Sequence, residues 1–364
     1  MPSWTPEQDR ALAEVARWLE TKGGAQVFRL FGYAGTGKST LARHVAANVE
    51  GDVCFAAFTG KAALVMRSKG CEGARTIHSL IYRASDTETE EPTFVLNDDS
   101  DAARAKLIVV DECSMVDEEL GRDLLSFSKK VLVLGDPAQL PPVKGGGFFT
   151  EAEPDVMLAQ VHRQAADNPI IRLSMTIREG GRLERGDYGQ ARVVSREGLD
   201  PALVTSADQV LVGLNRTRRA YNARLRQFRG FSGDLPKSGE KLVCLRNNRK
   251  KGLLNGGLFT VKSAGALRRG KVRMLVIPEE GEGRILRVGV IPQFFDAGES
   301  EIPYALRKDS DEFDYGYALT VHKAQGSQWD EVALFDESYA FREHRARWLY
   351  TGVTRAAKRL TVVA

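Results

Sequence analysis

The sequence predicts an α/β protein built on parallel β-sheets, and two observations carry this prediction. Short runs of β-branched and other apolar residues recur along the chain, and segments with helical spacing of apolar residues lie between them. This alternation is typical of a parallel sheet that helices cover on both faces. The length of 364 residues allows two or three domains, at about 150 residues each.

Composition excludes several classes of protein. No apolar run approaches the ~20 residues of a membrane-spanning helix, and the first ten residues carry acids and lack the apolar core of a signal peptide. The four cysteines are far apart and show no Cys-x-x-Cys spacing, which argues against a zinc site or a disulfide scaffold and fits a reducing cytosol. The net charge of +4 is too small to indicate a nucleic-acid partner, so that prediction must rest on local charge. We expect an intracellular, multi-domain globular protein.

The first α/β core begins with an amphipathic helix. Thr5 caps the segment Glu7 to Leu19, whose apolar residues form one stripe, and the strand Val27–Phe31 follows. A glycine turn then leads into a helix at Ser39–Val49. The alternation continues with strands at Val53–Phe58, Leu107–Val110 and Val131–Leu134, and with helices at Lys61–Ser68 and Asp117–Ser128.

Two charged segments interrupt this alternation. Residues 86–101 carry seven carboxylates and no base, whereas residues 241–273 carry ten Lys or Arg and no acid. The basic segment is rich in glycines and short strands, such as Leu258–Val261 and Val272–Ile277, which is typical of a small antiparallel barrel.

A second α/β core surrounds the basic segment. A strand is expected at Gln209–Leu214, and the helix that follows it, Thr217 to Phe228, carries several arginines on its polar face. The strand-helix pattern returns after about residue 314. The layout expected is therefore two α/β cores, each carrying an insertion.

A phosphate-binding loop follows the first predicted strand. The segment GYAGTGKS at residues 32–39 matches G-x-x-x-x-G-K-[ST] in full and opens a helix. Glycines let backbone N–H groups turn toward phosphates, and the helix N-terminus adds partial positive charge. Lys38 would reach the β- and γ-phosphates, and the Ser39 hydroxyl would bind Mg²⁺.

Two carboxylates complete the expected hydrolytic site. The apolar strand at Leu107–Val110 ends in Asp111 and Glu112. Asp111 can hold Mg²⁺ through its waters, and Glu112 is placed to orient and deprotonate an attacking water. Because this pair follows a complete phosphate loop, the sequence predicts a nucleoside triphosphatase.

Three more polar residues are candidates for sensing the γ-phosphate. Gln139 lies in a proline-rich loop after the strand Val131–Leu134, and its amide can both donate and accept hydrogen bonds. Arg163 and Arg355 lie beyond the first core, from where arginines aimed at the γ-phosphate would couple hydrolysis to domain closure. Spacing alone favours the alternative that both arginines are solvated surface residues, as lone arginines usually are.

The full set of motifs resembles the superfamily 1B DNA helicases, the 5′→3′ branch that includes the RecD-like and phage Dda-like enzymes. Thr5-Pro-Glu-Gln8 is similar to the family's adenine-contacting Gln motif, and the phosphate loop, Asp111-Glu112 and the Gln139 loop are similar to motifs I, II and III. Motifs Ia and Ib are matched at 58–63 and 74–79, motif V at 318–327 and motif VI at 350–355, while Arg163 falls where motif IV is expected.

The resemblance implies two RecA-like P-loop domains that bind ATP and Mg²⁺ between them. By this reading, residues 1–150 form the first RecA-like domain with an inserted pin at about 83–105. Residues 151–235 and 310–364 form the second, with an SH3-like barrel inserted at 236–309. The ATP-binding residues would be Gln8, Gly35, Thr36, Gly37, Lys38, Ser39, Thr40, Arg163 and Arg355. Catalysis would fall to Lys38, Glu112, Gln139, Arg163 and Arg355, with Ser39 and Asp111 on the metal.

The resemblance also implies partners, namely single-stranded DNA and its junctions with duplex. The expected DNA contacts are Thr59, Lys61, Thr76, His78, Phe94, Arg249, Lys250, Lys251, Thr320, His322 and Lys323. Phe94, the only aromatic residue of the pin, could stack on the last base pair, although the acidic charge around it also fits a solvated loop. The bases at 249–251 would meet phosphates. We expect a monomer in the cytoplasm of a bacterial or phage-infected cell, associated with the nucleoid and acting in replication or repair.

Three alternatives stay open from the sequence. One is an RNA helicase of the same branch, because no motif reads the 2′-hydroxyl. Another is an ATP-switched clamp on a nucleic acid that does not unwind processively, which the intact Glu112 argues against. The third is a metabolic kinase with a phosphate loop, which leaves motifs V and VI unexplained.

Overall fold

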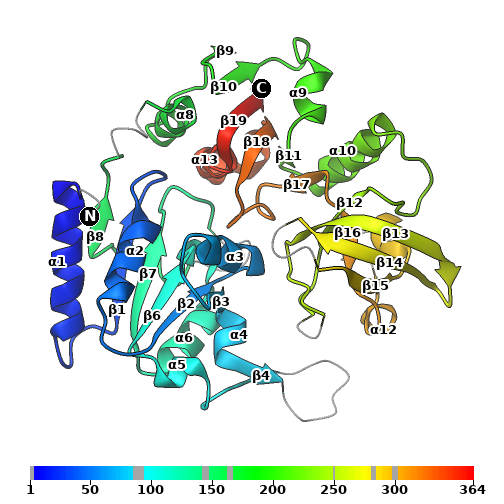
Figure 1. The fold of residues 1–364 in the computed structure, drawn as a ribbon. Coiled ribbons are helices and arrows are strands. Elements are labelled where there is room, and N and C mark those ends of the chain that lie inside the picture. The colour runs from blue at the N-terminus through cyan, green and yellow to red at the C-terminus, as the bar shows by residue number, and fades with distance from the viewer. Residues whose placement is uncertain are drawn as a thin grey trace. The chain divides into compact units, whose positions relative to one another are not determined.

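The computed structural model describes residues 4–84, 94–141, 147–161, 167–248, 251–279, 284–296 and 302–364. The chain forms two compact units (Figure 1). The first contains residues 1–183 and 343–354, and the second contains residues 184–342 and 355–364.

The first unit is built on a six-stranded sheet with the order β3-β2-β6-β7-β1-β8. Every neighbouring pair in it is parallel, which confirms the predicted sheet type. Its strands are β1 (Val27–Gly32), β2 (Val53–Ala57), β3 (Arg75–Thr76), β6 (Leu107–Asp111), β7 (Lys130–Gly135) and β8 (Val156–Leu158).

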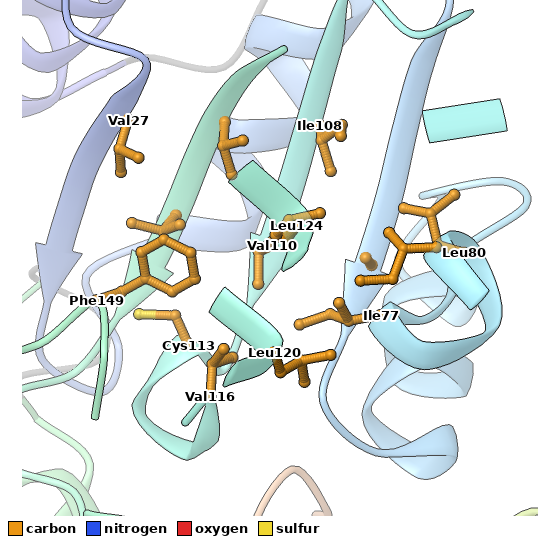
Figure 2. Close-up of a cluster of buried hydrophobic side chains, with 14 of the residues drawn as sticks. Val27, Ile77, Leu80, Ile108, Val110, Cys113, Val116, Leu120, Leu124 and Phe149 are labelled. Carbon is orange, nitrogen blue, oxygen red and sulfur yellow. The ribbon is translucent and has the colours of Figure 1, made fainter. Parts of the chain in front are cut away.

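Helices cover both faces of this sheet, because its strands are apolar on both sides. Leu107 and Val109 of β6 face a core formed with α1 (Pro6–Glu20) and α2 (Lys38–Ala47). Ile108 and Val110 face the opposite core, formed with α4 (Ile77–Ile81) and α6 (Glu118–Ser126), which Figure 2 shows. The other helices among the described residues of this unit are α3 (Gly60–Ser68), α5 (Asp101–Arg104), the 3-10 turn η1 (Cys113–Met115), α8 (Pro169–Arg178) and α13 (Arg345–Val353).

A two-stranded antiparallel hairpin lies where the pin is expected. It is formed by β4 (Tyr82–Ala84) and β5 (Phe94–Leu96), with Ala84 opposite Phe94. Residues 85–93 of the expected pin lie outside the described residues.

The structure divides the chain differently from the predicted domain boundary at residue 150. Residues 151–183 belong to the first unit. The reason is that β8 pairs in parallel with β1 as an edge strand, and α8 packs on α13 of the same unit.

The second unit contains another mainly parallel sheet with the order β17-β11-β18-β19-β10-β9. Only the edge strand β9 is antiparallel to its neighbour. The strands are β9 (Gly186–Asp187), β10 (Ala191–Val194), β11 (Gln209–Val212), β17 (Ala318–Thr320), β18 (Trp329–Phe335) and β19 (Ala356–Val363). The helices α9 (Pro201–Thr205) and α10 (Asn215–Phe228) accompany this sheet, and the 3-10 segment η3 (Ser338–His344) follows β18.

The basic segment folds into an antiparallel sheet with the order β15-β14-β13-β12-β16. Its strands are β12 (Lys241–Cys244), β13 (Leu258–Arg268), β14 (Lys271–Pro278), β15 (Leu286–Val290) and β16 (Phe313–Tyr315), with α11 (Gln293–Asp296) and α12 (Tyr304–Arg307) between the last two. The predicted closed barrel is not found in the described residues, because β15 and β16 remain the two edges of an open sheet.

The sequence predicts that the arginines of α10 lie on the polar face of the helix, but two of them are buried. Arg218 is 5% exposed and donates to Asp314 at 2.6 Å, while Arg226 is 7% exposed and donates to both oxygens of Glu240 at 2.6 and 3.0 Å. These buried ion pairs connect α10 to the region of the antiparallel sheet.

None of the helices in the described part of the chain combines the length and hydropathy needed to cross a membrane.

Candidate functional site

The phosphate loop lies between β1 and α2, as expected. Gly35 and Gly37 have φ values of +81° and +86°, which favour glycine, and α2 begins at Lys38. Gly32 sits at the end of β1, where a Cβ would lie 2.6 Å from Thr36 Oγ1 and 2.8 Å from Leu158 Cβ. The loop therefore depends on glycine for its conformation and for its close approach to β8.

The predicted phosphate-binding side chains gather at this loop. Lys38 Nζ donates to the Gly32 and Tyr33 carbonyls at 2.5 and 3.1 Å, which holds the ammonium over the loop. Thr36 is 1% exposed and its hydroxyl donates to Tyr33, so it shapes the loop from inside. Thr40 lies exposed in the first turn of α2.

Ser39 and Asp111 come together from α2 and the end of β6. Ser39 Oγ lies 3.2 Å from Asp111 Oδ2, and the other carboxylate oxygen accepts from the Glu112 N–H at 2.8 Å. A hydroxyl and a carboxylate are the hard oxygen ligands that Mg²⁺ prefers, and Mg²⁺ commonly uses one or two protein ligands with phosphates and water. No group of three or more His, Cys, Asp or Glu that could hold a metal occurs in the described ranges. The donor set thus fits Mg²⁺ held jointly with a nucleotide.

Glu112 has an unusual backbone at the tip of β6. Its φ is +54° and its ψ is +45°, a left-handed conformation that few residues other than glycine adopt. Such conformations cost about 1–3 kcal/mol and occur where surrounding structure enforces them, often at functional sites. Here the turn sends the chain from β6 into η1 directly after Asp111, so both carboxylates stand at the carboxyl end of the strand.

Gln139 is buried in the loop after β7, with 8% exposure. Asp136 builds this loop, because its side chain accepts from the Ala138 N–H at 3.0 Å and its carbonyl accepts from the Gln139 N–H at 3.1 Å. Gln139 Oε1 has no hydrogen-bond partner within the described residues. A buried amide oxygen without a partner is uncommon and suits a group that meets a ligand.

Sequence reasoning gave no role to Tyr350, although it lies in the segment matched to motif VI. Its hydroxyl accepts from the Ala34 N–H of the phosphate loop at 2.9 Å and donates to Asp136 Oδ2 at 2.7 Å. The next residue, Thr351, accepts from the Leu140 N–H at 2.9 Å. No signal in the sequence finds these contacts, because the partners are more than 200 positions apart.

Gln8 connects α1 to the same loop. Its side-chain oxygen accepts from the Thr5 N–H at 3.0 Å in a capping box, and its Nε2 donates to the Thr36 carbonyl at 3.0 Å. Gln8 is 2% exposed. The residue expected to contact adenine is therefore held in place by the phosphate loop.

The two predicted arginines lie in different situations. Arg163 is outside the described residues. Arg355 belongs to the second unit, is 5% exposed and donates to the Ser327 carbonyl at 3.1 Å. In the first unit, a further arginine lies at the phosphate loop, because the Arg178 guanidinium stacks 3.8 Å from the centre of the Tyr33 ring.

Three of the predicted DNA contacts of the first unit, Thr59, Lys61 and Thr76, have structural roles or are buried. Thr59 and Thr76 are helix caps, accepting from the Ala62 and Ser79 N–H groups at 3.1 Å each. Lys61 is 2% exposed, so it does not present its ammonium on the surface that the sequence predicts for it.

An aromatic row lies beside the hairpin. His78 is exposed, with ring centres 6.4 Å from Phe58 and 5.6 Å from Tyr82, and Tyr82 begins β4. Phe94 on β5 is 60% exposed. These rings offer surfaces on which bases can stack.

In the second unit, the residues matched to motif V form the turn after β17. The Thr320 hydroxyl accepts from the Lys323 N–H at 3.3 Å, His322 packs on Phe341 with ring centres 5.3 Å apart, and the Lys323 side chain is exposed. Among the three bases predicted in the insertion at 236–309, Arg249 and Lys250 lie outside the described residues. Lys251 pairs with the buried Asp311 at 2.5 Å. Much of its charge is thus neutralised within the fold.

Positive charge instead lies on the outer face of the antiparallel sheet. Val272, Met274 and Val276 of β14 are buried, so the alternating Arg273 points to the other face. Arg287 and Arg268 share this face, because Arg287 is opposite Leu275 and Arg268 is opposite Lys271. Arg268, Arg273 and Arg287 are exposed and form no ion pair within the part of the chain that the structure describes.

Family comparison agrees with the order of the motifs. A model of an AAA domain matches residues 3–197, more than half of the chain, and a model of a UvrD-like helicase C-terminal domain matches residues 315–363. The ATP-dependent RecD2 DNA helicase of Deinococcus radiodurans is 30% identical over 375 aligned residues, which cover 95% of this chain and 48% of that protein. The chain therefore spans about half the length of this relative.

Two solved structures have a similar fold. One, described as the basis of DNA unwinding at forked double-stranded DNA by two coordinating Pif1 helicases, has a TM-score of 0.62 and 19% identity, and the match covers 100% of this chain and 92% of that chain. The other, a Pif1 helicase from Bacteroides in complex with ADP-AlF3 and single-stranded DNA, has a TM-score of 0.60, 17% identity and coverage of 100% and 93%. Identities at this level show the fold alone.

Proposed function

Because this chain belongs to the superfamily 1B helicases, we propose that it is an ATP-dependent DNA helicase that moves 5′→3′ on single-stranded DNA and separates duplex ahead of it. The single observation that supports this most is the convergence of Lys38, Ser39 and Asp111 at a glycine-dependent loop. The relative from Deinococcus radiodurans is described as an ATP-dependent DNA helicase, in agreement with this activity.

Hydrolysis would proceed from the groups at the phosphate loop. Lys38 binds the β- and γ-phosphates, and Ser39 and Asp111 hold Mg²⁺, which when bound neutralises charge on the phosphate oxygens. Glu112 orients the attacking water and takes its proton. Gln139 supplies its buried, unpartnered amide oxygen to the water or its N–H to the γ-phosphate, while Arg163 and Arg355 supply positive charge to the transferred group.

Coupling of hydrolysis to movement requires the second unit. We propose that the two units are the RecA-like domains, that Gln8 contacts adenine, and that Arg355 responds to the γ-phosphate. The parallel sheet in each unit supports this proposal. The open antiparallel sheet of the second unit takes the place of the SH3-like insertion of the family, with the chain acting as a monomer.

Single-stranded DNA is the proposed partner, contacted through its phosphates and by stacking. His78 and Phe94 would stack on bases in the first unit, and Thr320, His322 and Lys323 would contact the strand in the second. The exposed arginines on the outer face of the antiparallel sheet support phosphate binding there, beyond the bases predicted at 249–251.

Two substitutions test the hydrolytic assignment. Lys38→Ala and Glu112→Gln should each reduce DNA-stimulated ATP turnover by at least about 100-fold, because each removes a group that acts on the transferred phosphoryl or on the water. The matched controls Lys22→Ala and Glu153→Gln change exposed residues and should leave turnover unchanged. Ordinary turnover by either site variant would refute the assignment.

Strand displacement then tests polarity and substrate. Duplexes with a 5′ or a 3′ single-stranded tail, in DNA and in RNA, are incubated with the protein with and without ATP. We expect displacement of the 5′-tailed DNA duplex alone. Displacement of RNA would identify an RNA helicase, and ATP turnover without displacement of any strand would identify a nucleic-acid clamp.

A further inference from the structure

We propose that Tyr350 is a positioning residue for ATP hydrolysis, through whose hydroxyl helix α13 holds the phosphate loop and the Gln139 loop in register. This inference rests on the proposed ATPase function and adds to it a residue of the segment matched to motif VI to which the resemblance assigns no role. Tyr350 and the groups to which it is hydrogen-bonded all belong to the first unit.

The direction of each hydrogen bond at Tyr350 is fixed by chemistry. The Ala34 N–H group can only donate and the Asp136 carboxylate accepts, so the Tyr350 hydroxyl accepts the first hydrogen bond at 2.9 Å and donates the second at 2.7 Å. Tyr350 is 1% exposed, and burial together with the nearby Asp136 carboxylate raises its pKa, so the hydroxyl keeps the proton that it donates. The hydroxyl is therefore a neutral link between two loops that do not follow one another in the chain.

The Gln139 loop is held at both ends by consecutive residues of α13. Tyr350 binds Asp136 at the start of the loop, and the Thr351 hydroxyl accepts from the Leu140 N–H at 2.9 Å directly after Gln139. Thr351 in turn donates to the Arg347 carbonyl at 2.7 Å, which fixes its rotamer on the helix. The position of the Gln139 amide thus depends on where α13 lies.

Helix α13 ends at Val353, and Arg355, the arginine proposed to respond to the γ-phosphate, follows shortly after it in the chain. Five positions separate Tyr350 from Arg355, which is the first residue of the following segment of the second unit. A shift of the phosphate loop or the Gln139 loop on binding a γ-phosphate would move Tyr350 and Thr351, and α13 would transmit that shift to the peptide that carries Arg355. Tyr350 would then act through the groups that contact the nucleotide rather than on the nucleotide itself.

The packing role of the ring can be separated from the role of the hydroxyl. Trp348 and Val353 of α13 are also fully buried, so the helix keeps apolar anchors when the hydroxyl is removed. Tyr350→Phe retains the ring and deletes the two hydrogen bonds. We expect kcat to fall by about 10- to 100-fold, which corresponds to the loss of hydrogen bonding to a charged group.

The effect should appear in kcat and not in nucleotide binding. The affinities for ATP and ADP, measured by titration that also counts competent sites, should stay within about three-fold of wild type. The matched control is Tyr315→Phe, which removes a buried hydroxyl that donates to the Asp234 carbonyl at 3.1 Å in the second unit. Its kcat per competent site should equal that of wild type, even if its melting temperature falls as much as that of Tyr350→Phe.

A double-mutant cycle provides the second measurement. Asp136→Asn keeps the shape of the side chain and weakens the bond from Tyr350, so the double variant with Tyr350→Phe should be no slower than the slower single variant. A kcat for Tyr350→Phe within two-fold of wild type, or additive losses in the cycle, would overturn the inference. Absence of ATP turnover in the wild-type protein would instead overturn the proposed function.

Discussion

Gly32 closes β1 where the neighbouring strand and the phosphate loop leave no room for a side chain. A Cβ would lie 2.8 Å from Leu158 Cβ and 3.0 Å from the Leu158 carbonyl oxygen. We expect Gly32→Ala to lower the free energy of unfolding by about 1–3 kcal/mol, since crowding in packed regions costs this much. It should also weaken ATP binding, because the loop that follows must shift.

Chemical denaturation and nucleotide titration measure the two effects of Gly32→Ala. Gly289→Ala is the matched control, because a Cβ there meets only Lys271 Cδ at an ordinary 3.8 Å. Equal stabilities and ATP affinities for the two variants would contradict the expected crowding.

Single residues also show which features of the site could be predicted from the sequence and which could not. Lys38, Ser39 and Asp111 could be predicted because each lies at a fixed offset within a short motif, and the structure brings them to one loop. Tyr350 could not be predicted as a link, because its partners at Ala34 and Asp136 are adjacent only after folding. The burial of Lys61 was missed for the same reason, since a lysine is assigned to the surface unless its surroundings are known.

Elements were predicted best where local signals and periodicity agree. Helix α1 begins and ends within a residue or two of its expected limits, because the capping box at Thr5 and Gln8 is written into the sequence. Closure of the antiparallel sheet is not found among the described residues, since glycines and short strands indicate antiparallel pairing but not whether β15 and β16 meet. The arginines of α10 were assigned to solvent because their acidic partners lie outside the helix, Glu240 directly before β12 and Asp314 in β16.

The hairpin formed by β4 and β5 gives a prediction for duplex separation. Phe94 is 60% exposed at its start, and a base stacked on an aromatic ring contributes about 1–3 kcal/mol. We expect Phe94→Ala to slow unwinding of a 5′-tailed duplex by about 10-fold or more, while ATP turnover on single-stranded DNA stays within about two-fold. Removing a wedge affects duplex separation and leaves the nucleotide site unchanged.

A second exposed phenylalanine is a matched control for Phe94. Phe228, at the end of α10, is 57% exposed, so Phe228→Ala loses a similar apolar surface in the other unit. Unwinding assays run beside single-stranded ATPase assays separate the two outcomes. If Phe94→Ala unwinds as fast as Phe228→Ala, the hairpin is a solvated loop and does not act as a wedge.

For the whole molecule, net charge is a poor guide to where a polyanion binds. The total of +4 combines an acidic stretch at 86–101 with a basic stretch at 241–273. Within the basic stretch, the fold neutralises Lys251 through Asp311 and leaves Arg268 and Arg273 exposed, where the neighbouring strand adds Arg287. Affinity for DNA should therefore depend on which arginines the fold leaves without an acid.

Salt dependence tests this distribution of charge. Each phosphate contact on a single strand contributes about 0.7 to the slope of log K against log salt concentration, so three contacts contribute about 2. Replacing Arg268, Arg273 and Arg287 together by Ala should reduce that slope by up to about 2 and weaken binding of oligo-dT at low salt. Replacing Arg104, Arg122 and Arg359, which pair with Asp101, Glu118 and Glu331, changes the net charge by the same amount. If the slope of log K against log salt concentration falls equally in both triple variants, overall charge controls binding. If it falls only in the variant of Arg268, Arg273 and Arg287, the phosphate contacts lie on the antiparallel sheet.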